Sequence, residues 1–378
     1  MALIYYYGDV PVQKEEVEEK FAIGNLQQFS SKSITLNKNL SFEFREGTVK
    51  TKDLWNNQPL VIPDYTPIGI NKPLSVEILC AYSGDAPRKF LGRKKDIMTV
   101  SAVKGYNTFD AAPKAINHIK KKVEDNTHIR IGAGDDGSPV IYYTKALDVS
   151  SLLLSYELVA DTFSDETIKT IGSLFASAAG LPIFAPAAPF LLAGSVISGL
   201  IGNIGKSLLE SKAFMREDET LSFGRAGIET SVAKQVVVCN ESDINDLNGY
   251  KPGSIKVGDK NKPSLVSKKN GKAYSGNAPY LLLNRDGKEK PELESFSPKL
   301  ASAAVLEKYY GAKDRGAATS EILQTAMTFY NDYSYQEKAR KLSKEIDGMK
   351  VGSDAHNRAS ELLEAYKKNI QTDQFKVK

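Results

Sequence analysis

The sequence predicts an α+β protein in which two antiparallel, sandwich-like β-rich regions are separated by an apolar αα-hairpin and followed by C-terminal helices. Three observations predict this class. Short apolar runs punctuated by Pro, Gly and Asn recur on both sides of the chain's middle, residues 170–205 carry no charged side chain, and helical periodicity begins at Pro298. We therefore expect four parts: a β-rich domain with one helix at 1–160, the hairpin at 161–213, a second β-rich region at 214–297 and a helical region at 298–378.

The composition is that of a folded protein with nearly balanced charge. The chain has 378 residues, of which 41% are hydrophobic, enough for two or three domains with ordinary cores. Lys+Arg 50 nearly cancel Asp+Glu 46, so the net charge of +4 does not by itself indicate a nucleic-acid or membrane partner. The N-terminal residues lack a basic n-region and a sustained apolar h-region. We therefore expect no Sec-type signal peptide and a cytoplasmic protein.

The first β-rich region contains strands and one helix. Alternation in LSVEILCAY places four residues on one face of a strand, which suits a sheet with one buried face: Leu74, Val76, Ile78 and Cys80. Further strands are predicted in ITLNKNLSFEF, PLVIP, DIMTVSAVKG, SPVIYYT and SLLLSYELVAD. Residues 111–123 instead predict a helix, with a proline in its first turn and three lysines near its end.

The uncharged residues 170–205 divide into two predicted helices. Ser164 can cap the first helix, which runs to about Gly180, and the second begins near Pro186, because three prolines interrupt the pattern there. Small residues spaced by four line one face of each helix, so the two helices can approach closely. These packing faces are Gly172, Ala176 and Gly180 in the first helix and Gly194, Ser198 and Gly202 in the second.

The same stretch allows a membrane interpretation. The second helix offers about 20 uncharged residues, or ~30 Å at helical rise, which equals the thickness of a bilayer core. The first helix offers only about eleven, or ~16 Å, and the many Gly, Ala, Ser and Pro residues make insertion less favourable than for a Leu-rich span. The sequence therefore favours a hairpin buried in a core or an oligomer interface. Insertion into a bilayer is the alternative.

The last part of the chain returns to strands and then to helices. ETLSFGRAGIETSV, KQVVVCNES and APYLLLNRDG predict strands, whereas the Lys, Gly and Asn content of residues 245–277 predicts long turns or a loop. Three helices are then predicted, near residues 298–310, 319–346 and 353–370.

Two glycine-rich stretches imitate phosphate-binding motifs without the spacing or context of one. The stretch from Gly199 ends in Gly-Lys-Ser, but five residues rather than four separate Gly199 from Gly205. Residues 132–137 match G-x-G-x-x-G, yet they lead into a strand-like run and not into a helix N-terminus. The first stretch does not predict nucleotide binding, and the second predicts a hairpin turn.

Metal-ligand and nucleophile patterns are also missing from the sequence. The three histidines, His118, His128 and His356, are not spaced as metal ligands. Cys80 and Cys239 each lie in an apolar strand-like run, which predicts buried free thiols. We expect no cofactor and no metal, and the sequence leaves enzymatic activity uncertain while favouring its absence.

One basic cluster is a candidate contact for an anionic surface. It comprises Arg88, Lys89, Arg93, Lys94 and Lys95 in a predicted loop between strands. Lysine-rich loops are most often solvated, so contact with acidic lipid headgroups or an acidic partner is the functional alternative. Tyrosines are too scattered beside the basic residues to predict a platform for stacking nucleic-acid bases.

Two functional hypotheses follow. The first is a non-enzymatic structural or interaction protein that self-associates or binds a protein partner, with the apolar hairpin as core or oligomer interface. The second is a membrane-acting effector, whose hairpin 170–205 inserts into a bilayer after a trigger while residues 88–95 hold the body at an anionic lipid surface. Such a protein would be membrane-associated on activation.

Overall fold

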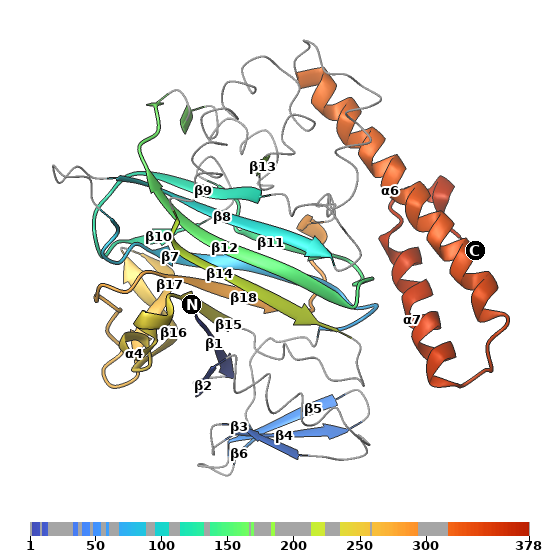
Figure 1. Ribbon diagram of the computed structural model, residues 1–378, viewed down its shortest axis with the longest axis horizontal. Coiled ribbons are helices and arrows are strands. Elements are labelled where there is room, and N and C mark those ends of the chain that lie inside the picture. Colours follow the sequence, from blue (N-terminus) through green and yellow to red (C-terminus); the bar gives the residue numbers. More distant parts are fainter. Residues whose placement is uncertain are drawn as a thin grey trace.

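Two antiparallel β-sheets stacked face to face form the body of the protein, and two long helices stand at one end of it (Figure 1). The computed structural model describes residues 2–7, 10–13, 33–36, 40–45, 48–53, 58–59, 68–87, 95–105, 114–131, 137–165, 168–169, 183–185, 213–223, 235–257, 259–293 and 317–377. The sheet-rich architecture agrees with the predicted sandwich. The predicted αα-hairpin falls almost entirely outside these residues.

The first sheet has the strand order β10-β7-β18-β15-β1-β2, and β11 also pairs with β7. Its strands are β1 (Ala2–Tyr7), β2 (Val10–Gln13), β7 (Leu74–Tyr82), β10 (His128–Arg130), β11 (Val140–Thr144), β15 (Gln235–Cys239) and β18 (Tyr280–Asp286). The strands β15 and β18 come from the predicted region 214–297 and pair with strands from the region 1–160. The two β-rich stretches of sequence therefore share one hydrogen-bonded sheet.

The second sheet has the order β13-β9-β8-β12-β14. Its strands are β8 (Lys95–Gly105), β9 (Lys114–Val123), β12 (Ser151–Asp161), β13 (Ile183–Ala185) and β14 (Ala213–Ser222). A separate four-stranded sheet contains β3 (Ser33–Leu36), β4 (Leu40–Arg45), β5 (Thr48–Asp53) and β6 (Gln58–Pro59). All neighbouring strands in these sheets are antiparallel, as the alternating sequence pattern predicts.

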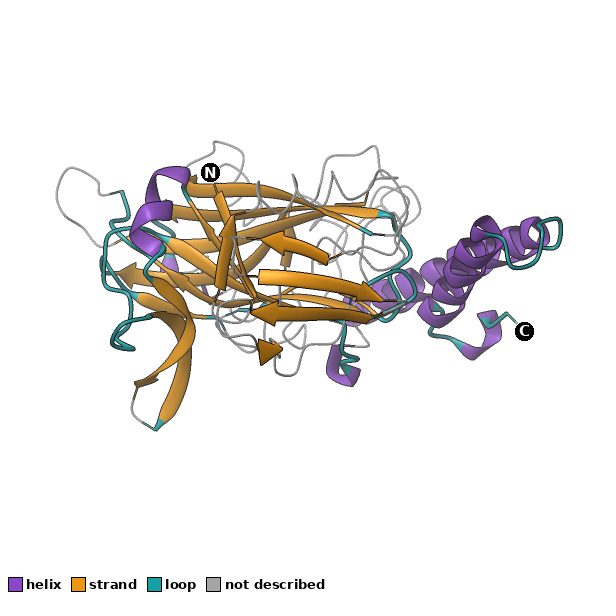
Figure 2. Ribbon diagram, turned by 90° about the horizontal axis from the view of Figure 1, so that it is seen from below, coloured by secondary structure: helices purple, strands orange, loops and turns teal. Residues whose placement is uncertain are grey.

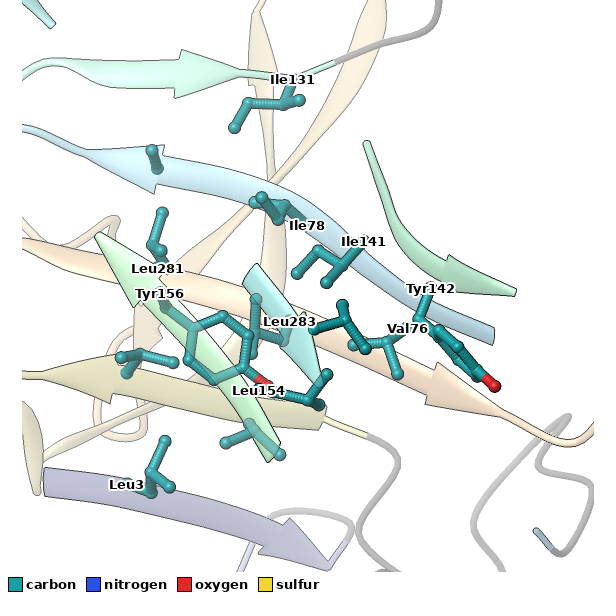
Figure 3. Packing of buried hydrophobic residues seen from close by; sticks show 14 of the residues in the cluster. Leu3, Val76, Ile78, Ile131, Ile141, Tyr142, Leu154, Tyr156, Leu281 and Leu283 are labelled. Carbon is teal, nitrogen blue, oxygen red and sulfur yellow. The ribbon is translucent and has the colours of Figure 1, made fainter. Parts of the chain in front are cut away.

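The main core lies between the two large sheets. Alternate residues of β12 point inward, among them Leu154 and Tyr156, and they meet Leu281 and Leu283 of β18 (Figure 3). All four side chains are fully buried. Burying one such side chain stabilises the fold by about 1.5–3 kcal/mol, so this interior accounts for the stacking of the sheets.

A β-bulge changes the predicted face of Cys80. Leu282 pairs with Cys80 and Leu283 pairs with Ile78, so Leu79 is an extra residue in β7. Such a bulge reverses the alternation beyond it. Val76 and Ile78 face the main core as predicted, whereas Cys80 belongs to the cluster on the other side of the sheet. The prediction that placed Cys80 on the same face as Val76 is therefore wrong.

That other side of the first sheet is covered by a hairpin that the sequence did not predict. Residues 245–277 were expected to form turns or a loop, but they contain β16 (Tyr250–Val257) and β17 (Lys260–Ser267), which pair along their length. With α4 (Ile244–Leu247), this hairpin buries Leu247 and Leu265 against the sheet. The hairpin has few apolar residues, but they are enough to hold it on the sheet because the sheet supplies the other residues of this buried cluster.

The helix predicted at residues 111–123 is instead strand β9. The prediction rested on a proline in the first turn and three lysines near the end. The apolar residues Ile116 and Ile119 are also three apart, a spacing compatible with a helix. In the structure Val100 pairs with Ile116 and Met98 with Ile119, and a bulge at Asn117 adds the extra residue between them. The bulge puts both isoleucines on one face of a strand, which explains why a strand imitated a helix here.

The C-terminal helices agree with two of the three predictions. They are α6 (Ala317–Ile346) and α7 (Asp354–Asn369), and Ser353 caps α7 by accepting a hydrogen bond from the backbone N–H of His356 at 3.2 Å. The short 3-10 helices are η2 (Glu241–Asp243), η3 (Pro291–Leu293) and η4 (Asp373–Phe375). The predicted helix at 298–310 lies outside the described residues. Figures 1 and 2 both show α6 and α7 beyond the end of the sheets, and we call α6, α7 and η4 the helical arm.

Candidate functional site

The uncharged segment 170–205 belongs to the connection between two neighbouring strands of the second sheet. The strands β12 and β14 are antiparallel partners, and Val159 lies opposite Ala213. Such neighbours can be joined by about 2–5 residues, whereas here roughly 50 residues, 162–212, lie between them. The chain therefore leaves the sheet and returns to it at adjacent positions.

The middle of this connection is strand β13, which extends the edge of the same sheet. Ile183 lies opposite Ile116 of β9, and Ala185 lies opposite Lys114. The predicted packing faces lie on either side of β13 and outside the described residues: Gly172, Ala176 and Gly180 before it, and Gly194, Ser198 and Gly202 after it. The helical conformation of these faces stays a prediction. The strand β13 occupies the break that the prolines predict between them.

A buried carboxylate fixes the point where the chain leaves β12. Asp96 is 4% exposed, and its two oxygens accept hydrogen bonds from the backbone N–H groups of Lys122 and Phe163, both at 2.9 Å. In the sheet register Asp96 lies opposite Asp161, the last residue of β12. The carboxylate thus ties the ends of β8 and β9 to the beginning of the connection 162–212.

Part of the predicted basic cluster lies at this same corner of the sheet. Lys95 is half-buried and begins β8, next to Asp96. The other members lie outside the described residues: Arg88, Lys89, Arg93 and Lys94. Lysines of β9 lie nearby, and one of them, Lys121, forms an ion pair with Asp165. The structure therefore brings Lys95 close to the start of the connection 162–212, although the two are far apart in sequence.

Four side chains form an interior polar cluster between the sheets that the sequence did not predict: Tyr5, Tyr156, Glu219 and Arg285. Arg285 donates to Oε2 of Glu219, and both side chains are 0% exposed. The hydroxyl of Tyr5 donates to Oε1 of Glu219 at 2.5 Å, and that of Tyr156 donates to Oε2 at 2.9 Å. The guanidinium carbon of Arg285 also lies 5.6 Å from the centroid of the Tyr5 ring.

The interior polar cluster pairs one negative with one positive charge away from solvent, while Nε and Nη1 of Arg285 have no hydrogen-bond partner among the described residues. Burial, together with the Glu219 carboxylate, raises the pKa of Tyr156 well above its usual value. Burial lowers the pKa of Arg285, but the same carboxylate more than offsets this and the net pKa is raised. Arg285 therefore stays charged and Tyr156 neutral at physiological pH. Both charges are 0% exposed, so the cluster joins the two sheets within the interior.

Both cysteines are buried free thiols, as predicted. Burial raises the pKa of Cys80 to about 12 and that of Cys239 to about 12. The thiolate is the reactive form of cysteine, so neither residue is a nucleophile at neutral pH. The Cys239 thiol instead donates to the backbone oxygen of Ala2, with sulfur and oxygen 3.8 Å apart.

An aromatic cluster links the first sheet to the β16–β17 hairpin, where the ring centroid of Tyr250 lies 4.9 Å from that of Tyr274. The Tyr82 ring stacks on Tyr280 with centroids 5.1 Å apart, and it also contacts His128 at 4.6 Å and Tyr274 at 5.3 Å. The Tyr82 hydroxyl donates to the backbone oxygen of Gly276 at 2.9 Å. Burial lowers the pKa of His128, which keeps its ring neutral at physiological pH. These contacts pack the aromatic rings against one another.

The helical arm meets the sandwich through polar contacts at the β11–β12 turn. The side chain of Asn369 donates from Nδ2 to the backbone oxygen of Ala146 at 2.6 Å, and its Oδ1 accepts from the Thr144 hydroxyl at 3.0 Å. Nearby, burial raises the pKa of Asp148, against the opposing effects of Lys338 and of a hydrogen bond from Tyr335. Asn369 and Asp148 therefore mark the base of the arm.

Neither the general features of the described residues nor any known protein identifies this chain. Within the described residues, no group of three or more His, Cys, Asp or Glu side chains is placed to hold a metal ion. None of the helices in the described ranges combines the length and apolar character needed to cross a bilayer. No family model, curated protein or solved structure matches this chain. Its function is therefore inferred from the geometry of its own residues.

Proposed function

We propose that this chain is a non-enzymatic interaction protein that self-associates, and that its uncharged segment 170–205 packs against protein, in the core of one chain or between copies. The observation that carries the proposal is the place of this segment, in a connection of about 50 residues between two paired strands. The pairing does not need so long a connection. Long connections within compact domains commonly carry function, and a segment without charge favours burial.

The chemistry of the described residues supports a binding role over catalysis. The buried charges of Glu219 and Arg285 neutralise each other inside the sandwich, and both cysteines are held as thiols. We propose no cofactor and no nucleic-acid partner, because the net charge is only +4. A cytoplasmic location is part of the same proposal.

The helical arm offers a further contact surface for a partner. On α6, Phe329 is 42% exposed and Tyr333 is 53% exposed, and these residues are four apart and so lie on one face of the helix. Exposed aromatic side chains are enriched where proteins bind one another. The arm projects beyond the sheets (Figure 2), which leaves this face accessible to a second chain.

The test is the mass of the full chain compared with two variants of the segment. In one variant residues 166–208 are replaced by about five Gly and Ser residues, which suffice to join neighbouring strands. In the matched control, residues 170–182 and 186–205 become Gly and Ser at unchanged length, so that β13 remains.

We expect the wild type to be one defined oligomer by light scattering and both variants to unfold cooperatively. A segment that packs between copies predicts a smaller mass for both variants, whereas a segment in the core of one chain predicts unchanged masses and association through other surfaces. A monomeric wild type would contradict the proposed self-association. Loss of association in the short variant alone would show that length, and not apolar character, matters.

The second candidate function is the membrane-acting effector, and one observation favours it. The connection that contains the uncharged segment begins beside Lys95 and the lysines at the end of β9. An apolar segment next to basic residues suits an anionic bilayer surface. Flotation with anionic and with neutral liposomes separates the two functions: flotation with leakage of anionic vesicles supports the effector, whereas a protein that stays with the soluble fraction as one oligomer supports the interaction protein.

A further inference from the structure

The outer face of the second sheet has a charged half and an apolar half. On the charged half, β14 presents Arg216, which lies 3.6 Å from Glu157 and 3.7 Å from Asp218, and Leu153 of β12 is 38% exposed. The apolar half is formed by β8, β9 and the end of β12. Its residues are almost completely buried: Met98 0%, Val100 1%, Ile116 1%, Ile119 6% and Val159 1% exposed.

The register shows that the apolar half lies on the outside of the sandwich. Met98 is opposite both Val159 and Ile119, and Val100 is opposite Ile116, so these residues share one face. The neighbouring residue Ile97 points the other way, into the main core. The buried clusters that the described residues form lie between the two sheets and on the first sheet, and they do not include the apolar half.

We infer that the apolar half is the docking site of the uncharged segment 170–205 of the same chain. Three observations support this occupant. The segment is tied at both ends to β12 and β14, which belong to this sheet. Its middle, β13, pairs with β9, and Ile183 is opposite Ile116, so it occupies a position on the same face. Its composition, apolar and uncharged, matches a face made of Met, Val and Ile.

The inference rests on the proposed function in one respect, because it takes the segment to be buried against protein and not in lipid. It goes further by naming the surface, and by assigning the contact to one chain rather than to two. Self-association then uses other surfaces, such as the exposed face of α6.

The first test measures the reactivity of a thiol placed on the apolar half. In the variant Val100→Cys the new thiol replaces a side chain that is 1% exposed. We expect slow reaction with a thiol reagent in the full chain without lipid. Reaction should be about tenfold faster or more when residues 170–182 and 186–205 are Gly and Ser, because a buried thiol reacts only in molecules that open locally. Equal rates in the two backgrounds would overturn the inference, since another part of the chain would then cover this face.

Matched variants control for general unfolding. Leu153→Cys, on the charged half, should react quickly in both backgrounds, and Val103→Cys, inside the main core, slowly in both. If Val103→Cys becomes reactive, the Gly and Ser variant is unfolded. The single substitution Leu192→Asp then replaces it, and the same acceleration at Val100→Cys is expected.

A second test decides between the same chain and a second copy. The pair Ile116→Cys and Ile183→Cys occupies opposite positions of neighbouring strands, where the Cβ atoms are about 4.5–5.5 Å apart. After oxidation we expect a disulfide within one chain, seen as a monomer on a denaturing gel. A disulfide-linked dimer, or no disulfide, would overturn the inference. A monomeric wild type with a protected Val100→Cys thiol would leave the docking site in place and refute only the proposed self-association.

Discussion

Removing the negative charge of the interior polar cluster is predicted to destabilise the sandwich strongly. In Glu219→Gln the shape of the side chain is kept, but Arg285 loses its only charged partner among the described residues while remaining 0% exposed. Leaving one member of a buried ion pair uncompensated costs about 3–5 kcal/mol. Two tyrosine hydroxyls, of Tyr5 and Tyr156, also exchange a charged acceptor for a neutral one, at roughly 0.5 kcal/mol each.

The expected loss of unfolding free energy is therefore about 4–6 kcal/mol, against a total of roughly 5–15 kcal/mol for a typical domain. Urea unfolding followed by circular dichroism measures it. At an m value of about 3 kcal/mol/M, the midpoint should fall by roughly 1.3–2 M.

Two controls make the measurement specific. Glu337→Gln removes the carboxylate of an exposed ion pair on α6, in which Oε1 of Glu337 lies 3.3 Å from Nη1 of Arg340. This substitution should change the unfolding free energy by at most about 0.5 kcal/mol. Adding Arg285→Met to Glu219→Gln removes both buried charges and should recover most of the loss. The reasoning is refuted if Glu219→Gln loses less than about 1 kcal/mol, or if the double variant is less stable than the single variant.

Three further predictions follow from other parts of the fold. Burial raises the pKa of Cys80 in the folded chain to about 12, above the value of 9.0 for a free thiol. The contribution of the protonated thiol to the unfolding free energy is therefore complete below pH 9 and is lost as the pH rises toward 12. Urea titrations of Cys80→Ala should show that the unfolding free energy falls between these pH values less steeply than in the wild type, by about 1.4 kcal/mol per pH unit. A slope equal to that of the wild type would contradict this prediction. Asn369→Ala removes the hydrogen bond to Ala146 and should speed amide exchange in α7 by about tenfold, whereas the exposed Asn357→Ala should not; equal exchange in both variants counts against the junction. Gly84 has φ +54°, and an added Cβ would lie 2.4 Å from the backbone oxygen of Asn277. Gly84→Ala should therefore lower the unfolding free energy by roughly 1–3 kcal/mol, which a lower melting temperature would reveal. A melting curve equal to that of the wild type would disprove the close approach.

Much of the fold could be predicted because burial imposes alternation on strands. The strands β8, β12, β15 and β18 were found from their sequence patterns, and so were α6 and α7. The errors occur where one residue breaks the alternation. Leu79 and Asn117 each add a residue to a strand, which moved Cys80 to the other face and gave β9 a helical spacing. A bulge depends on the partner strand, so a single strand's sequence does not reveal it.

The interior polar cluster could not have been predicted from local sequence. Glu219 lies in a run of four consecutive charged residues, 216–219, and Arg285 lies next to the last residue of an apolar strand, so each resembles an ordinary surface charge. Their meeting requires the register of β14 with β12 and the stacking of the two sheets. For the uncharged segment the reverse holds: its composition was visible at once, whereas its place between β12 and β14 required the strand order.

The size of the connection 162–212 itself favours docking on protein. Lengthening a flexible connection costs about 0.6 kcal/mol for each doubling, so extending one from about 5 to about 50 residues costs only ~2 kcal/mol. Burying roughly 80 Å² of apolar surface offsets that, at about 25 cal/mol per Å². Because five buried apolar residues of the second sheet lie on the face to which β13 adds Ile183, the chain can recover this free energy on its own sheet without a membrane. Transfer to a bilayer would have to exceed that gain and also expose Met98 and Val100, so a trigger that acts on this face is what the membrane hypothesis requires.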